Sequence, residues 1–185
     1  AGRRGDVSGG RLRMEFQFLG SGDAVGSGGR FNTCFHVTSS AGSFLIDCGA
    51  SSLIAMRKFG VDPNRIHTVF VSHLHGDHFG GIPLLLLASL YEEERKDLLR
   101  IAGPLGIEAR VQRLAAAMGH PLDSREWTFP ITFEELPAGK QCEIGPVHVT
   151  TFETHHSPDA CPHGMVIEVG GRRIAYSGDT GWFDG

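Results

Sequence analysis

The densest group of residues able to do chemistry is the segment His73-Leu74-His75-Gly76-Asp77-His78, which holds three histidines and one aspartate. Imidazole nitrogens and carboxylate oxygens together suit zinc, manganese or iron better than calcium. His73 and His75 are two residues apart, so in extended backbone their side chains leave on the same side. Four such side chains would crowd a single ion, which favours two adjacent metal ions. The alternative is a polar loop in which the histidines occur by chance.

The neighbouring residues predict where this segment lies. Residues 67–72 form a β-branched and aromatic run, which predicts a buried strand before the segment. Pro83 and the apolar run 84–88 predict a helix after it. The histidine segment is therefore expected on a loop at the carboxyl end of a strand, where open α/β sheets usually build their sites.

Composition limits the classes of protein to consider. A chain of 185 residues is long enough for one domain with a core, expected over 14–185. A net charge of −4 argues against a surface for long nucleic acids. Four scattered cysteines without a CxxC pair suggest reduced thiols and a cytoplasmic protein. No apolar run is long enough to suggest a membrane span, and no secretory signal is visible. Residues 1–13 are expected to be a disordered leader or an expression remnant.

The rest of the chain alternates strand and helix patterns, which predicts an α/β fold. Residues 14–18, 34–37, 43–46, 98–101, 131–152 and 165–177 read as strands, the last group being a hairpin around Gly170-Gly171. Residues 51–59 and 107–118 read as helices that glycines end. The glycine-rich stretch 20–30 lacks the GxGxxG spacing and a following amphipathic helix, so a dinucleotide site is disfavoured. Its glycines would let backbone N–H groups approach an anionic ligand, and a tight turn explains the stretch equally well.

HLHGDH matches the HxHxDH signature, and over residues 16–185 the chain resembles the metallo-β-lactamase-fold hydrolases. Three further stretches are similar to the ribonuclease Z-like and phosphodiesterase branch: FLGSGDAVGSGGRFNT with Asn32, AGPLG at 102–106, and YSGDTG at 176–181. The resemblance implies an αββα sandwich. It also implies a last histidine ligand well after the aspartate of YSGDTG, and no such residue precedes Gly185. We therefore expect a sandwich truncated at its C-terminus. A partner that supplies the rest, or a degenerate relative, are the alternatives.

The same resemblance implies the site residues. It assigns His73, His75 and His156 to one metal, Asp77 and His78 to the second, and Asp179 to a position between the two. Asp77 and Asp179 would be the catalytic carboxylates. Asp47 would orient the histidine segment, with a helix N-cap as its alternative role. His155 is the alternative to His156, because neighbours in extended backbone point to opposite faces. His36, His163 and Cys161 are expected to be ordinary strand or loop residues.

Two divalent ions, expected to be Zn²⁺ with Mn²⁺ or Fe²⁺ as alternatives, would lower the pKa of a shared water from about 15.7 to about 7. The first hypothesis is therefore a phosphodiester hydrolase that acts on an RNA 3′ end or on a small phosphodiester. A thioester or lactone hydrolase and a non-catalytic metal-binding domain are the alternatives. The chain has no room for a long tRNA-gripping arm, and relatives suggest a homodimer. Possible phosphate contacts that could equally be solvated surface are Arg30, Arg172 and Arg173.

Overall fold

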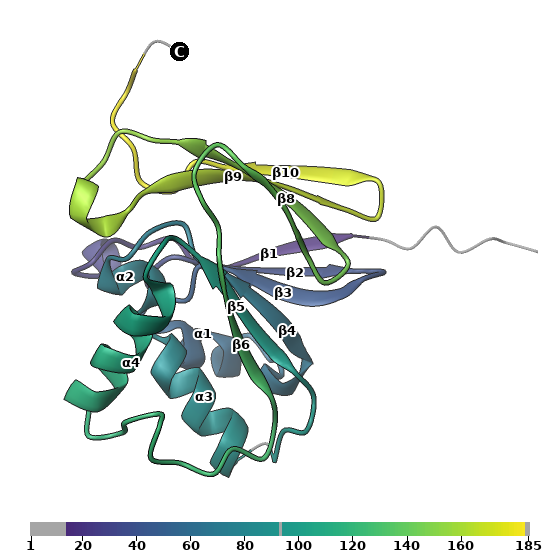
Figure 1. Ribbon diagram of the computed structural model, residues 1–185, viewed down its shortest axis with the longest axis vertical. Coiled ribbons are helices and arrows are strands. Elements are labelled where there is room, and N and C mark those ends of the chain that lie inside the picture. Colours follow the sequence, from purple (N-terminus) through teal and green to yellow (C-terminus); the bar gives the residue numbers. More distant parts are fainter. Residues whose placement is uncertain (1–13, 93, 184–185) are drawn as a thin grey trace, which may run out of the picture.

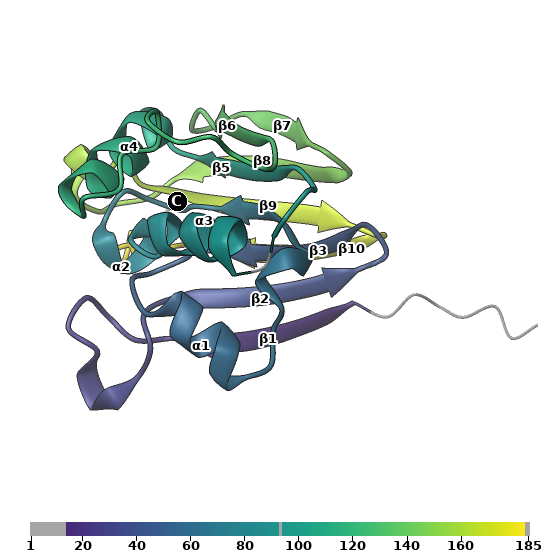
Figure 2. The ribbon, with the colours of Figure 1, turned by 90° about the horizontal axis from the view of Figure 1, so that it is seen from below.

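The computed structural model describes residues 14–92 and 94–183. The predicted leader or expression remnant, residues 1–13, lies outside the described residues. Within them the chain forms two β-sheets with helices on one side (Figures 1 and 2).

The first sheet carries the strands of the amino-terminal part of the chain. Its order follows the sequence: β1 (Glu15–Gly20), β2 (Cys34–Ser39), β3 (Gly42–Ile46), β4 (Ile66–Phe70), β5 (Leu99–Gly103) and β6 (Ile131–Glu135). The pairs from β1 to β3 are antiparallel, and those from β3 to β6 are parallel. The carboxyl ends of β3, β4 and β5 therefore lie at the same edge of the sheet.

The second sheet is antiparallel throughout. Its order is β10 (Arg172–Tyr176), β9 (His163–Val169), β8 (Val147–Glu153) and β7 (Gln141–Ile144). The predicted hairpin is confirmed, since Gly170 and Gly171 join β9 to β10 with φ of 56° and 71°, the left-handed values of a primed turn.

Helices cover the outer face of the first sheet, and the second sheet covers its other face (Figures 1 and 2). The helices are α1 (Ser52–Lys58), α2 (Gly76–Phe79), α3 (Ile82–Tyr91) and α4 (Ile107–Ala117), with short 3-10 turns at Ser27–Gly29, Pro63–Arg65 and Pro158–Ala160. Alternation along β3 supplies both cores: Leu45 faces the helices, whereas Phe44 and Ile46 face the second sheet. The central strands are apolar because both of their faces are buried.

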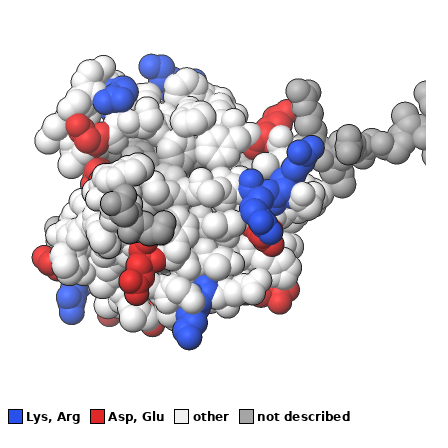
Figure 3. All heavy atoms as spheres, turned by 90° about the horizontal axis from the view of Figure 1, so that it is seen from above, with Lys and Arg blue, Asp and Glu red and all other residues white. Residues whose placement is uncertain are grey.

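Three of the four layers of the expected αββα sandwich are present, as α, β and β. No helix among residues 14–92 and 94–183 covers the outer face of the second sheet (Figure 1). Figure 3 shows this face, where charged side chains of both signs are scattered. At the sheet edge, Phe16 and Phe18 of β1 are 39% and 65% exposed; Phe16 stacks on Phe35, and Phe18 meets the same ring edge to face. The second sheet leaves these rings uncovered, because it ends at β10.

One local prediction was wrong, and two helix ends differ in detail. Residues 76–79, predicted as loop, form the single helical turn α2. Ser51 is the N-cap of α1, and its hydroxyl contacts Asn32 and makes no capping hydrogen bond. Met118, the last residue of the predicted helix 107–118, is the C-cap of α4 and is 38% exposed. None of the described helices has the length and hydropathy needed to cross a membrane.

Arg95 is a buried cation that joins several elements of the first layer. Its side chain is among the largest that are fully buried, and it packs against the ring of Phe129. Its guanidinium donates at 2.7–3.2 Å to the backbone carbonyls of Pro63, Asn64, Ile66, Asp97 and Leu98. These carbonyls come from the segments that enter β4 and β5. Arg95 therefore fixes the starts of β4 and β5. The far end of β4 leads into the histidine segment, and β5 pairs beside it.

The variant Arg95→Met should lower the free energy of unfolding by about 3 kcal/mol, because it leaves buried carbonyls without donors. Urea unfolding followed by circular dichroism measures this change. Arg113→Met, at an exposed position of α4, is the matched control and should cost at most about 0.5 kcal/mol. Equal losses in the two variants would contradict the role of Arg95.

Candidate metal centre

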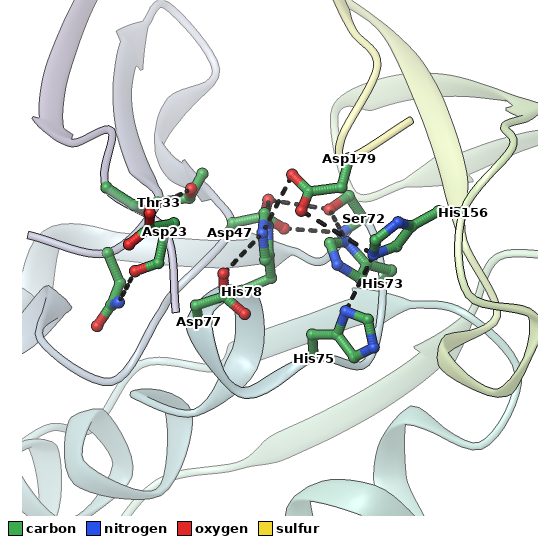
Figure 4. A network of polar contacts seen from close by, with 12 residues as sticks. Asp23, Thr33, Asp47, Ser72, His73, His75, Asp77, His78, His156 and Asp179 are labelled. Carbon is green, nitrogen blue, oxygen red and sulfur yellow. Dashed lines mark hydrogen bonds and ion pairs between the residues drawn. The ribbon is translucent and has the colours of Figure 1, made fainter. Parts of the chain in front are cut away.

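The structure brings together residues from three distant parts of the sequence. The histidine segment follows β4, His156 follows β8, and Asp179 follows β10 (Figure 4). His156 Nε2 lies 3.0 Å from His75 Nδ1, and the ring of His73 is centred 4.9 Å from each of those two rings. The three imidazoles therefore face a common point.

A second group shares His73 with the first. His78 Nε2 lies 3.5 Å from Asp77 Oδ2 and 3.5 Å from Asp179 Oδ1. The other carboxylate oxygen of Asp179 lies 4.0 Å from His156 Nε2. Donor atoms of His73, His75 and His156, and likewise of His73, His78 and Asp179, lie within 4.8 Å of one another. Asp179 thus presents one oxygen to each histidine group.

The hydrogen bonds of His73 leave its Nε2 free for a metal. The Ser72 hydroxyl donates its proton to Asp47 Oδ2 at 2.9 Å, so it can only accept from His73 Nδ1 at 3.0 Å. His73 Nε2 then keeps its lone pair, is buried, and has no hydrogen-bond partner among the described residues. An orphaned buried nitrogen is costly unless a ligand uses it. Two imidazole nitrogens bound to one tetrahedral zinc ion would lie about 3.4 Å apart. His156 Nε2 and His75 Nδ1 lie 3.0 Å apart.

The same argument applies to His78. Its Nδ1 lies 2.7 Å from Asp47 Oδ2 and donates to it, so the lone pair of the neutral ring is on Nε2. That lone pair faces the carboxylates of Asp77 and Asp179. Such an arrangement is repulsive unless the ring is protonated or a cation lies between the groups. The donor set therefore fits a pair of divalent ions.

Asp47 has the contacts of an orienting residue, and it is not a helix N-cap, since Ser51 occupies that position. Its carboxylate is fully buried and accepts from Ser72 N, Ser72 Oγ, His78 Nδ1 and Tyr176 OH at 2.7–2.9 Å. Its backbone has a φ of 58°, a left-handed value that aspartate tolerates better than most residues. Figure 4 shows Asp47 next to Ser72 and His78.

Asn32 joins the glycine-rich stretch to the loop before α1. Asn32 accepts from Ser51 N at 3.1 Å and donates to the carbonyl of Asp23 at 2.7 Å, which fixes the stretch to the start of α1. Next to Asn32, a Cβ on Gly49 would lie 2.1 Å from the Asp77 carbonyl. Only glycine at position 49 permits this close approach, and the side chain of Asn32 meets the same point, so Asn32 lies next to the α2 turn.

His155 and the other residues set aside from the sequence lie elsewhere. The ring of His155 stacks on Phe183, with centroids 4.2 Å apart, and belongs to neither donor group. His36 contacts Gln17 and Ser43 in the first sheet. Two of the arginines considered for phosphate contacts are engaged with protein groups: Arg30 donates to the Ser27 carbonyl, and Arg173 pairs with Glu168.

Sequence reasoning missed Ser72, Tyr176 and His163. Tyr176 alternates with Ile174 toward the core between the sheets, a signal that marks it as inward but not as an Asp47 partner. His163, expected in a loop, begins β9 and is buried. Its backbone N–H donates to the Ser72 carbonyl at 3.1 Å, and its Nε2 has no partner among the described residues.

Burial sets the protonation of these histidines. It is the main cause that lowers the pKa of His73 to about 3, helped by repulsion from His78. It also lowers the pKa of His163 to about 4. For His78, burial acts in the same direction but is outweighed by the Asp47 hydrogen bond and nearby carboxylates, so its pKa is raised. His73 and His163 are therefore neutral at pH 7 in the metal-free chain.

The metal-free chain should lose stability as the pH falls from 6.5 toward 4, because His73 and His163 bind protons when unfolded that they do not bind when folded, and His163 can be tested apart from the candidate metal ligands. The pKa difference corresponds to about 3 kcal/mol for this residue. Urea unfolding across this pH range measures it, and His163→Gln should make the dependence shallower. His148→Gln, at an exposed position of β8, should leave it unchanged. An unaltered dependence in His163→Gln would contradict the assignment.

Comparison with solved structures identifies the fold. Human tRNase Z, short form, superposes with a TM-score of 0.72 at 23% identity, over 90% of this chain and 69% of that one. The metallo-β-lactamase-fold protein YhfI from Bacillus subtilis gives 0.71 at 19% identity, over 92% and 64%. The architecture is therefore the metallo-β-lactamase fold, as expected from the sequence.

Sequence comparison identifies the family. Ribonuclease Z from Methanothermobacter thermautotrophicus is 34% identical over 145 residues, which are 78% of this chain and 45% of that protein. The chain spans about half the length of the curated relatives it matches. The family described as "Anti-Pycsar protein Apyc1" matches residues 14–184. The chain therefore belongs to the Anti-Pycsar protein Apyc1 family, a ribonuclease Z-like group with the metallo-β-lactamase fold.

Proposed function

We propose that this protein is a dinuclear metal-dependent hydrolase of phosphodiester bonds. In this proposal His73, His75 and His156 hold one ion, Asp77 and His78 hold the other, and Asp179 lies between them. The observation that carries it is the overlap of the two donor groups, with one oxygen of Asp179 directed to each. A single-ion site would not need a carboxylate in this position. The names of the relatives, a ribonuclease Z and a tRNase Z, favour phosphodiesters over thioesters and lactones.

When bound, the two ions would supply Lewis-acid chemistry that acidifies water and offsets charge on the phosphoryl oxygens. The protein residues would do the remaining work. Asp77, whose carboxylate is about 10% exposed, would accept a proton from the attacking water and hold it in line. The side chains of Asp179 and His156 are 49% and 28% exposed, so substrate would approach from their side. In this proposal the glycine-rich stretch before Asn32 would border the substrate.

The substrate is proposed as a small phosphodiester or an RNA 3′ end. The net charge of −4 argues against a long RNA contact. On the face seen in Figure 3, lysines and arginines lie in separate groups without a continuous basic surface. Within the described residues, α3, β5 and α4 follow one another through short connections that hold no tRNA-gripping arm. These features favour the small phosphodiester. Ribonuclease names among the relatives keep RNA as the second candidate.

Zinc is the proposed metal, because histidine-rich sites with carboxylates suit it, and Mn²⁺ or Fe²⁺ would satisfy the same donors. The free cysteines Cys34, Cys48, Cys142 and Cys161 support the proposal of a cytoplasmic protein. We also propose that two copies of the protein form a homodimer.

Hydrolysis of bis(p-nitrophenyl) phosphate tests the reaction, using the chain with the sequence that flanks it in the natural protein. Turnover should require a divalent ion and stop with a chelator. Asp179→Asn should lower kcat at least about 100-fold, because the amide lacks the charge needed between two cations. Metal-independent turnover, or faster turnover of thioesters and lactones, would contradict the proposal. Cleavage of a tRNA precursor in parallel separates the two substrate candidates.

The choice between the neighbouring histidines has a direct test. His156→Ala should lose one of two bound zinc ions in a chelator competition, because only His156 faces His75. His155→Ala is the matched control and should keep both ions, since its ring stacks on Phe183. Loss of an ion from the His155 variant alone would reverse the assignment.

A further inference from the structure

Tyr176 closes a ring of contacts around His78. The Tyr176 hydroxyl donates to Asp47 Oδ2 at 2.7 Å, and the same oxygen accepts from His78 Nδ1 at 2.7 Å. The other nitrogen of His78 lies 3.5 Å from Asp179. Asp179 follows Tyr176 by three residues in the chain. The imidazole is therefore held between two carboxylates, and Tyr176 connects one of them to the segment that carries the other.

This ring spans the two sheets. Asp47 follows β3 and His78 lies in α2, beside the first sheet, whereas Tyr176 ends β10 of the second sheet. The hydroxyl of Tyr176 thus fixes the end of β10 relative to the histidine segment, through Asp47. Figure 4 shows Asp179 reaching toward His78 from the segment that follows β10, and Asp47 next to His78.

Close packing between Tyr176 and Asp179 supports the same alignment. Gly178 has a φ of 61°, and a Cβ there would lie 2.9 Å from Ser72 Cβ and 3.1 Å from Ser72 Oγ. The segment therefore rests directly on Ser72, which itself donates twice to Asp47. With the backbone held at residue 178 and the phenol held at residue 176, little freedom is left for the carboxylate of Asp179.

The phenol acts here only as a donor. Burial, and then the charge of Asp47, raise the pKa of Tyr176 far above its ordinary value, so the hydroxyl keeps its proton. Its ring also packs edge-on against Phe35, with centroids 5.4 Å apart. Phenylalanine at this position would keep the ring packing and remove only the hydrogen bond, which separates the two contributions experimentally.

We propose that Tyr176 is a positioning residue for the second metal site, one that holds His78 and Asp179 in register through Asp47. The inference rests on the proposed function, because it concerns the metal that His78, Asp77 and Asp179 would bind. The ion at His73, His75 and His156 would depend on Tyr176 less. It shares Asp179 with the second site, but the Tyr176–Asp47–His78 contacts include neither His75 nor His156. Partners that orient a metal-binding imidazole typically change metal affinity by about 10- to 100-fold when they are removed.

The test compares Tyr176→Phe with Tyr91→Phe, since the chain has two tyrosines and the side chain of Tyr91 is exposed on α3. Both are made in the chain with its natural flanking sequence. Zinc affinities of the two sites are measured by competition with a chromophoric chelator, and Co²⁺ absorption reports on each site. NMR of the metal-free protein follows the Nδ1 proton of His78.

Tyr176→Phe should weaken the second ion about 10- to 100-fold, leave the first within about 3-fold, and change the Co²⁺ bands of the second site only. It should also shift the His78 Nδ1 proton signal, while the thermal midpoint of the metal-free protein stays close to that of Tyr91→Phe. Equal weakening of both ions together with a lowered midpoint would assign Tyr176 a purely structural role. Unchanged affinities and an unchanged proton signal would likewise overturn the inference. If the unaltered protein bound no metal, the proposed function itself would fail.

Discussion

The structure depends on one buried carboxylate. Asp47 is withdrawn from solvent, adopts a left-handed backbone conformation, and accepts hydrogen bonds from Ser72, His78 and Tyr176. A buried charge is tolerable only when such donors surround it, so each of them is held in place in turn. The donors belong to the end of β4, to α2 and to β10. One side chain thereby fixes the histidine segment and aligns the two sheets at the edge where the site lies.

The sheets explain why the site lies at this edge. Parallel pairing of β3, β4 and β5 brings their carboxyl ends together, and the histidine segment leaves from the central strand of the three. The second sheet then contributes His156 and Asp179 from the ends of β8 and β10. The protein thus assembles the donors from the ends of rigid strands, which limits the reorganisation needed when a metal binds. Arg95 supports the opposite ends of β4 and β5 from within the helix layer.

Much of this arrangement could be predicted from the sequence. The strands and helices follow from the spacing of apolar residues along the chain. The six residues HLHGDH hold four of the candidate metal donors. The αββ layers, the hairpin at Gly170-Gly171 and the approach of His156 to His75 agree with those expectations. The contacts of Ser72, Tyr176 and His163 could not be predicted, because they arise only when the second sheet packs on the first. The helical turn α2 was missed because four residues carry too little periodicity to distinguish a turn of helix from a loop.

The central claim is that two metal ions share the space bounded by the histidine segment, His156 and Asp179. X-ray absorption of the zinc-loaded protein, with its natural flanking sequence, tests it most directly, because the spectrum reports the ligands and any neighbouring metal. The account predicts nitrogen and oxygen ligands at about 2.0–2.2 Å and a second zinc at about 3.5–4 Å. Sulfur ligation, or zinc without a metal neighbour at full loading, would contradict it.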